Sequence, residues 1–274
     1  MKLFFLGDFT DRGVNDIEVL TIFLLLKILN PNSVFLLQGN HENPEVQVQY
    51  SREASFFCYW KELFSAIYRT FPVGMSCDEP EGRICLGHAA SPLSEDLRGY
   101  HLWKAIPKET IVQEFQSRKG VSPKQQQAIE ELRHILPEDA LKGEMTNWAD
   151  IGPDVFPSKR GAGYVITDKV IQHSLRANDF KFLLRGHEHV YQDVIVKGKN
   201  GKEKVICTTL PAATAANMYG RNGEQQNQGI LFEPHGKVRN WRKWIDRAHG
   251  RGMEFKYVPV PPPPVGMYEQ FPSE

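Results

Sequence analysis

One pattern, which occurs four times, limits the folds open to this chain. A short apolar run ends at a glycine that adjoins a polar residue of a type that binds metals. The runs and their polar ends are 3–6 with Asp8, 34–37 with Asn40 and His41, 84–86 with His88, and 180–184 with His187. Such runs are typical of buried strands, because glycine lets the backbone turn sharply where a strand ends. Since ligands gather at the carboxyl ends of strands in α/β sheets, we expect these side chains at one sheet edge.

Helical periodicity occupies the segments between these strands. We predict helices over 15–29, with Asn15 or Asp16 as N-cap, over 53–71, and over 124–136, opened by Ser122-Pro123. The longest apolar run, 22–29, is interrupted by Lys27 and is too short for a membrane span, so we interpret it as a buried helix face. The later sequence predicts strands, with hairpin turns at 198–201 and 234–236.

Composition excludes several classes of protein. The 41% hydrophobic and 24% charged residues are close to the average for globular proteins. With 33 basic and 33 acidic residues the net charge is zero, so we expect neither a nucleic-acid nor a membrane partner. The four scattered cysteines form no Cys-x-x-Cys pair, and the apolar start is too short for a signal peptide. These features predict a soluble intracellular protein with buried free thiols, in the cytoplasm with the nucleus left open.

The polar strand ends suggest metal chemistry. The loop over 7–13 carries two carboxylates and a guanidinium, and the next strand ends in Gly39-Asn40-His41-Glu42. Carboxylate, amide oxygen and imidazole are suitable ligands for divalent Mn, Fe or Zn. A single histidine is more often structural, but four strand ends of this chemistry are hard to explain by packing.

Taken in order, these motifs resemble those of the phosphoprotein phosphatase family of Ser/Thr phosphatases, within the calcineurin-like metallophosphoesterases. The family patterns Gly-Asp-x-x-Asp-Arg-Gly and Gly-Asn-His-Glu are intact at 7–13 and 39–42. The later motifs are His88-Ala89-Ala90-Ser91-Pro92, Trp148-Ala149-Asp150, Arg160-Gly161 and Arg185-Gly186-His187-Glu188. The resemblance implies an α/β (α+β) fold, a β-sandwich of two mixed sheets flanked by helices.

The resemblance also implies a reaction, the metal-dependent hydrolysis of phosphoserine and phosphothreonine in proteins by a metal-activated hydroxide. Two divalent ions (Mn, Fe or Zn) and a phosphoprotein substrate are implied, and a regulatory subunit is left open. The implied roles are Asp8 as the ligand shared by both ions; Asn40, His88 and His187 as ligands of the second ion; Arg12 and Arg160 as phosphate ligands; His41 as general acid; and Asp11 as the residue that orients it.

The chain departs from the family pattern in three places. The first family motif, Gly-Asp-x-His-Gly, does not occur, so the first metal site is expected to be weak, and whether Met1 is the true start is left open. His189 in Gly-His-Glu-His could join Asp8 at that site, or it could be an ordinary strand or loop residue. A tyrosine that the family carries in a late loop is absent from 209–215. An ungapped alignment places Gly87 at the fourth motif, but we prefer His88, because glycine has no side chain to bind a metal.

The domain prediction is one catalytic domain over 1–247, with an insertion at about 93–147. A flexible proline-rich tail over 248–274 follows, because Val-Pro-Val-Pro-Pro-Pro-Pro favours polyproline II. Two other functions stay open. One is a degenerate or truncated phosphatase that binds phosphoproteins or partners without turnover, and the other is a dinucleoside polyphosphate hydrolase of the same fold.

Overall fold

The fold was analysed in a computed structural model that describes residues 2–11, 15–78, 82–91, 113, 116–117, 119–136, 148–159, 163–188, 192–198 and 200–210. Arg12, Arg160 and His189 lie outside these residues, as do the second expected hairpin, most of the insertion and the proline-rich tail. Within the described ranges no helix combines the length and the apolar character that a membrane crossing needs.

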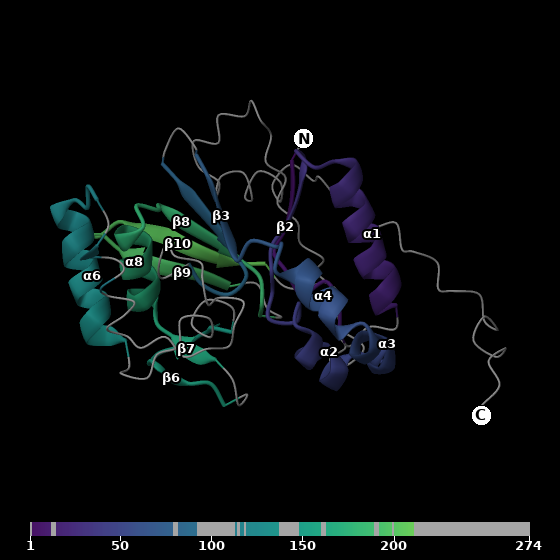
Figure 1. Cartoon of the computed structure of the whole chain (residues 1–274). Coiled ribbons are helices and arrows are strands. Elements are labelled where there is room, and N and C mark those ends of the chain that lie inside the picture. Colours follow the sequence, from purple (N-terminus) through teal and green to yellow (C-terminus); the bar gives the residue numbers. More distant parts are fainter. Residues whose placement is uncertain are drawn as a thin grey trace, which may run out of the picture. The chain divides into compact units, whose positions relative to one another are not determined.

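The first half of the chain forms a parallel strand pair with helices around it (Figure 1). Strands β1 (Leu3–Phe5) and β2 (Val34–Leu36) pair in register and are connected by α1 (Asp16–Leu29). Helices α2 (Pro44–Tyr50), α3 (Ala54–Tyr59) and α4 (Lys61–Tyr68) follow. The buried core of this half is Leu20, Val34, Leu36, Phe57, Phe64, Tyr68 and Phe71.

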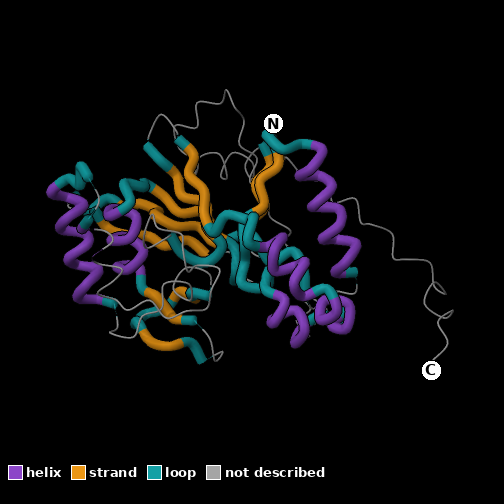
Figure 2. Tube along the Cα trace, viewed as in Figure 1, coloured by secondary structure: helices purple, strands orange, loops and turns teal. Residues whose placement is uncertain are grey.

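The second half is built on a five-stranded mixed sheet in the order β3-β4-β8-β10-β9. Its strands are β3 (Gly74–Cys77), β4 (Ile84–Gly87), β8 (Phe182–Arg185), β9 (Gln192–Lys197) and β10 (Glu203–Thr209). The central three are parallel, whereas β3 and β9 run antiparallel at the edges. Helices α6 (Pro123–Ile135) and α8 (Asp168–Ala177) lie side by side and bury Ile129, Ile171 and Leu175 in the core beside this sheet (Figure 2).

A small third sheet is formed by three short strands that come after α6 in the chain. Its strands are β5 (Asp150–Ile151), β6 (Phe156–Pro157) and β7 (Tyr164–Ile166), with β7 between the other two. The α/β fold with mixed sheets flanked by helices is therefore confirmed. The capped start of α6 at Ser122-Pro123 and the hairpin turn between β9 and β10 are also found where the sequence predicts them.

Two sequence predictions about the framework are wrong. The four glycine-terminated strands do not share one sheet edge, because β1 and β2 pair with each other and β4 and β8 belong to the larger sheet. The helix expected over 53–71 is interrupted at Trp60, which ends α3 and begins α4. Phe57 of α3 and Phe64 of α4 both lie in the core, with ring centroids 4.9 Å apart.

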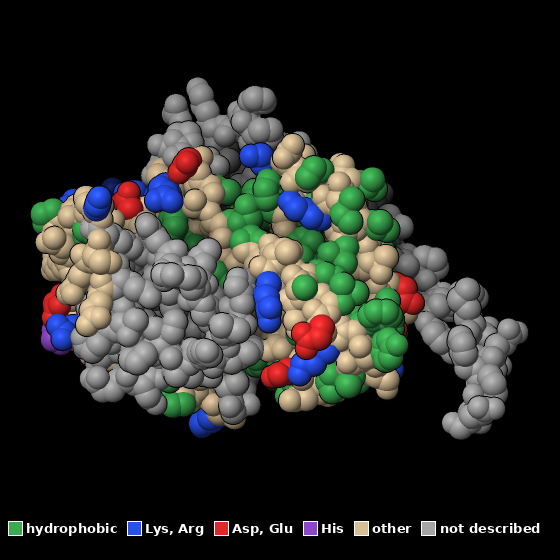
Figure 3. Space-filling model, viewed as in Figure 1, with side chains coloured by type: hydrophobic (Ala, Val, Ile, Leu, Met, Phe, Trp, Pro, Cys, Tyr) green, Lys and Arg blue, Asp and Glu red, His purple; other side chains and the backbone are tan. Residues whose placement is uncertain are grey.

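The apolar run in α1 and the cysteines also differ from expectation. Ile28 and Leu29 are 71% and 74% exposed, because α1 is apolar on every side and packs on its neighbours along one stripe only. Apolar side chains accordingly gather at the surface over the helices of the first half (Figure 3). All four cysteines are free, as expected, but only Cys85 and Cys207 are buried, and Cys58 is exposed.

Candidate metal centre

Four potential metal ligands from four loops meet at the strand ends. The atoms are Asp8 Oδ2, Asn40 Oδ1, His88 Nε2 and His187 Nδ1. His88 Nε2 lies 2.9 Å from Asn40 Oδ1, 3.2 Å from Asp8 Oδ2 and 3.2 Å from His187 Nδ1. His187 Nδ1 lies 2.9 Å from the same Asn40 oxygen. The sequence pattern is therefore right about the meeting of these side chains, although two sheets supply them.

Their spacing fits a bound divalent cation. With metal–ligand bonds of ~2.1 Å, neighbouring donors lie ~3.0 Å apart in octahedral and ~3.4 Å apart in tetrahedral coordination. His88 Nδ1 lies 2.6 Å from the Leu6 carbonyl, and donating its proton there leaves Nε2 with a lone pair. His187 Nε2 faces Asp150 Oδ1 at 3.5 Å, which favours a proton on Nε2 and a lone pair on Nδ1. A divalent cation between these four acceptors would satisfy all of them.

Unusual backbone conformations aim these side chains. Asp8, Asp11 and His187 have φ of 57°, 79° and 72°, in the left-handed region that non-glycine residues rarely occupy. Strain of this kind persists where the surrounding structure enforces it, often at functional sites. Two glycines make the crossing of the loops possible. A Cβ on Gly39 would lie 2.3 Å from Asp8 Oδ1, and one on Gly7 would lie 2.5 Å from the Gly39 nitrogen.

A buried carboxylate, Glu42, ties the first two loops together. Its Oε2 accepts hydrogen bonds from the backbone N–H groups of Asp8 (2.7 Å) and Gly39 (2.8 Å), and its Oε1 accepts from Phe9 (2.8 Å). The residue is 1% exposed. Glu42 therefore fixes the backbone that carries Asp8 without itself joining the four ligands.

The charges of the site are consistent with a cation position. Burial alone would raise the pKa of Asp8, but its contact with His88 holds it well below its usual range when no metal is bound. Burial, with the positive charge of Arg185, lowers the pKa of His187 to about 4, although its contact with Asp150 opposes the shift. His187 is thus neutral near pH 7, as a metal ligand must be. Burial and the Asp8 charge raise the pKa of Glu42 to about 7.

A histidine–carboxylate pair lies beside the four ligands. His41 Nδ1 and Asp11 Oδ2 are 2.6 Å apart, and the His41 backbone N–H donates to Asp8 Oδ1 at 3.1 Å. The Asp11 side chain is 1% exposed and that of His41 is 10% exposed, so the pair lies at the inner wall of the site. Burial raises the pKa of Asp11, and the hydrogen bond and charge of His41 oppose that shift.

Sequence reasoning missed the residues that support the ligands. Arg185 is fully buried and donates to the Ala149 carbonyl at 2.6 Å, to Thr209 Oγ1 at 3.1 Å and to the Glu188 carboxylate. It thereby connects the loop before β5 to the loop that carries His187. Glu42, Asp150 and Arg185 stand inside sequence motifs in which other residues were assigned roles. That position was the only indication in the sequence that these three residues support the site.

The structure thus brings together six of the nine candidate site residues, namely Asp8, Asp11, Asn40, His41, His88 and His187. His88 Nε2 is one of the four candidate ligand atoms that meet, whereas Gly87 ends strand β4. Arg12, Arg160 and His189 lie outside the described residues, so their roles stay predictions.

Comparison with known proteins identifies a family and several relatives of this chain. Residues 2–191 match the family model described as calcineurin-like phosphoesterase. The chain is 28% identical over 204 residues to the serine/threonine-protein phosphatase PP2A-like PPG1 of Candida albicans, which covers 67% of this chain and 39% of that protein. It is also 28% identical over 201 residues to the serine/threonine-protein phosphatase 6 catalytic subunit of Caenorhabditis elegans, which covers 69% of this chain and 50% of that protein.

The chain therefore spans half or less of the length of these curated relatives. Among solved structures it is similar, at 22% identity and a TM-score of 0.46, to a Saccharomyces cerevisiae serine/threonine phosphatase described as similar to human phosphatase PP5; the match covers 77% of this chain and 57% of that one. Because the family model matches well over half of the sequence, the chain belongs to the calcineurin-like phosphoesterase family.

Proposed function

We propose that this protein hydrolyses phosphoserine and phosphothreonine monoesters in proteins with the help of divalent metal ions. One observation carries the proposal. Four candidate ligand atoms meet, with contacts of 2.9–3.2 Å between neighbouring atoms, next to the His41–Asp11 pair. Both curated relatives described above are named serine/threonine-protein phosphatases, which supports a phosphoprotein as the substrate class.

The ligand set favours Mn, Fe or Zn, because it combines imidazole with carboxylate and amide oxygens. Asp8, Asn40, His88 and His187 would hold one ion, and Asp8 would be shared with a second ion that His189 helps to bind. When bound, such ions neutralise charge on the phosphoryl oxygens and lower the pKa of the attacking water.

The remaining residues would position the phosphate and move a proton. Asp11 holds His41 through Nδ1 at 2.6 Å, so Nε2 is the ring atom that would donate a proton to the leaving serine or threonine oxygen. Arg12 and Arg160 would bind the phosphate oxygens, since a planar guanidinium donates two parallel hydrogen bonds to such a group.

The test is Mn²⁺-dependent hydrolysis of p-nitrophenyl phosphate and of a phosphothreonine peptide. Asp8→Asn and His41→Asn should each lower kcat, the latter by ~10²–10⁴-fold, as expected for loss of a general acid. Asp154→Asn and His134→Asn make the same chemical changes away from the site and should keep the wild-type rate. Unchanged rates in Asp8→Asn and His41→Asn would refute the assignment.

A second candidate function is phosphoprotein binding without turnover. Among the described residues, one group of His, Cys, Asp and Glu side chains is arranged to hold a metal ion, namely Asp8, His88 and His187. This candidate predicts one metal per chain and no rate above background, whereas two bound metals with turnover would exclude it. If a dinucleoside polyphosphate is hydrolysed faster than the phosphopeptide, the protein would instead be a dinucleoside polyphosphate hydrolase, the third function that the sequence leaves open.

A further inference from the structure

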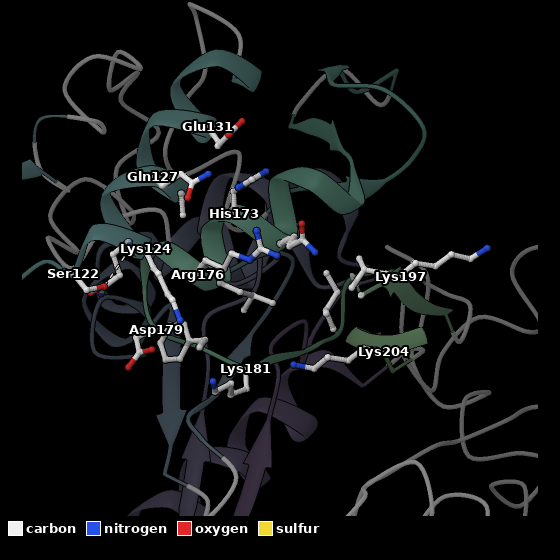
Figure 4. Close-up of a pocket in the computed structure, with 18 residues that line it drawn as sticks. Ser122, Lys124, Gln127, Glu131, His173, Arg176, Asp179, Lys181, Lys197 and Lys204 are labelled. Carbon is white, nitrogen blue, oxygen red and sulfur yellow. Dashed lines mark hydrogen bonds between the residues drawn. The ribbon is translucent and has the colours of Figure 1, made fainter. Parts of the chain in front are cut away.

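A cavity separate from the metal centre opens between α6, α8 and the β9–β10 hairpin (Figure 4). Its volume is about 690 Å³, within the ~300–1,000 Å³ typical of ligand sites. None of its lining residues belongs to the candidate metal centre. The metal chemistry proposed above therefore leaves this cavity without a function.

The lining of this cavity is strongly basic. Five cationic side chains and two carboxylates line it, so positive charges exceed negative ones by three with His173 neutral. The basic residues are Lys124, Arg176, Lys181, Lys197 and Lys204, and the acidic residues are Glu131 and Asp179. This excess contrasts with the zero net charge of the whole chain. We call this cavity the cationic pocket.

Three of the cations repel one another across the pocket. Arg176 comes from α8, Lys181 precedes β8 and Lys204 lies in β10, and the three side chains surround the same space in Figure 4. Burial, followed by the charges of Lys181 and Arg176, lowers the pKa of Lys204. Within the described part of the chain, none of the three side chains has an ion-pair partner. The three residues are exposed, so solvent screens part of this repulsion, and a bound anion would relieve the remainder.

The interior of the pocket is partly apolar. Leu175, Phe180, Val196 and Ile206 are among its lining residues, and Leu175 and Ile206 are 3% and 5% exposed. The Arg83 guanidinium lies over the Phe180 ring, 5.0 Å from its centroid, so one face of this ring is already covered. The pocket therefore offers an apolar surface beside the cations but little room for stacking a nucleotide base.

We propose that the cationic pocket binds an acidic segment of a partner protein, in which carboxylates alternate with apolar side chains. The carboxylates would pair with Arg176, Lys181 and Lys204, and an apolar side chain would contact Phe180 and Val196. A peptide fits this mixed lining better than a small polyanion, which would leave the apolar surface unused. A membrane fits less well, because the cations surround a concavity. This site is independent of the proposed phosphatase reaction.

The test is fluorescence anisotropy with a short fluorescein-labelled peptide of alternating Glu and Leu. The double variant Arg176→Glu/Lys204→Glu should weaken binding ~10-fold or more, since each tenfold corresponds to ~1.4 kcal/mol. Lys169→Glu/Lys202→Glu is the matched control, with one change in α8 and one in the hairpin, both outside the pocket. It should bind within ~2-fold of wild type at the same salt concentration.

Further arms separate this proposal from its alternatives. Arg176→Lys/Lys204→Arg keeps both charges and should restore binding, which excludes a loss caused by misfolding. Hydrolysis of p-nitrophenyl phosphate should be equal in wild type and both charge-reversal variants, so failure of the catalytic proposal would be seen separately. Equal peptide binding by wild type and the Arg176→Glu/Lys204→Glu variant would overturn the proposal. So would tighter binding of ATP, or of phosphatidylserine vesicles, through the same two residues.

Discussion

Replacing Glu42 should destabilise the metal centre although Glu42 is not among its ligands. In the native protein the backbone N–H groups of Asp8, Phe9 and Gly39 donate to the Glu42 carboxylate at 2.7–2.8 Å, and Glu42 is only 1% exposed. Glu42→Ala removes the acceptor of all three buried hydrogen bonds. Hydrogen bonds to a charged group contribute ~1.5–3 kcal/mol each, and water entering the space left behind would recover part of the loss. We expect the free energy of unfolding to fall by ~3–6 kcal/mol, a large share of the ~5–15 kcal/mol typical of a domain.

Glu42→Gln provides a graded comparison. Its single carbonyl oxygen can keep two of the three backbone donors, while its NH₂ group faces the third, so we expect a loss of ~1–3 kcal/mol. The assay is urea unfolding of the metal-free protein at pH 8, above the raised pKa of Glu42 at about 7, with Mn²⁺ affinity measured in parallel. A loss below ~1 kcal/mol in Glu42→Ala, with unchanged Mn²⁺ affinity, would refute this reasoning.

Three further predictions concern the close packing of the site, its titration and the framework. Gly39→Ala should lower Mn²⁺ affinity by ~10-fold or more, because its Cβ would lie 2.3 Å from Asp8 Oδ1; calorimetric titration measures this, and wild-type affinity would contradict it. His187 should contribute a loss of up to about 3 kcal/mol of stability in the metal-free protein as pH falls from 6.5 to 4, because unfolded His187 takes up its proton near 6.5 and folded His187 only near 4. Glu42, whose pKa is raised to about 7, contributes with the opposite sign in this window, so the His187 contribution is measured as the difference in urea unfolding between wild type and His187→Asn, and an equal pH dependence in both would exclude it. Ser122→Ala removes the side chain that caps α6 in a capping box with Gln125 and should cost ~1 kcal/mol in the same assay, with catalytic rate unchanged.

The sequence allowed the meeting of most of the candidate ligands to be predicted, because these residues follow short apolar runs at glycines. A strand that ends at a glycine must release its next side chain near the sheet edge, so Asp8, Asn40 and His88 could be located from local pattern alone. The choice of His88 over Gly87 likewise followed from chemistry, since only His88 has a donor atom.

The remaining features depend on contacts between distant segments. Nothing local shows that β1 and β2 form their own pair, since both sheets use the same kind of short apolar strand. The break at Trp60 has no local signal, because the helical spacing of apolar residues continues through it. Glu42 accepts hydrogen bonds from the backbone of Asp8 and Phe9, which precede it by 34 and 33 residues. Hydrophobic periodicity cannot reveal contacts between segments so far apart. The cationic pocket is also invisible in the sequence, because its lysines come from separate elements of a chain with zero net charge.

The central claim is that Asp8, Asn40, His88 and His187 form a divalent metal site. The most direct measurement is a Mn²⁺ titration followed by electron paramagnetic resonance, which reports free Mn²⁺, on wild type, His88→Asn and the control His134→Asn. We predict that wild type and His134→Asn bind Mn²⁺ with equal affinity and that His88→Asn binds it at least ~10–100-fold more weakly, since even supporting residues cost that much. Equal affinity in all three proteins, or no Mn²⁺ binding by wild type, would contradict the claim.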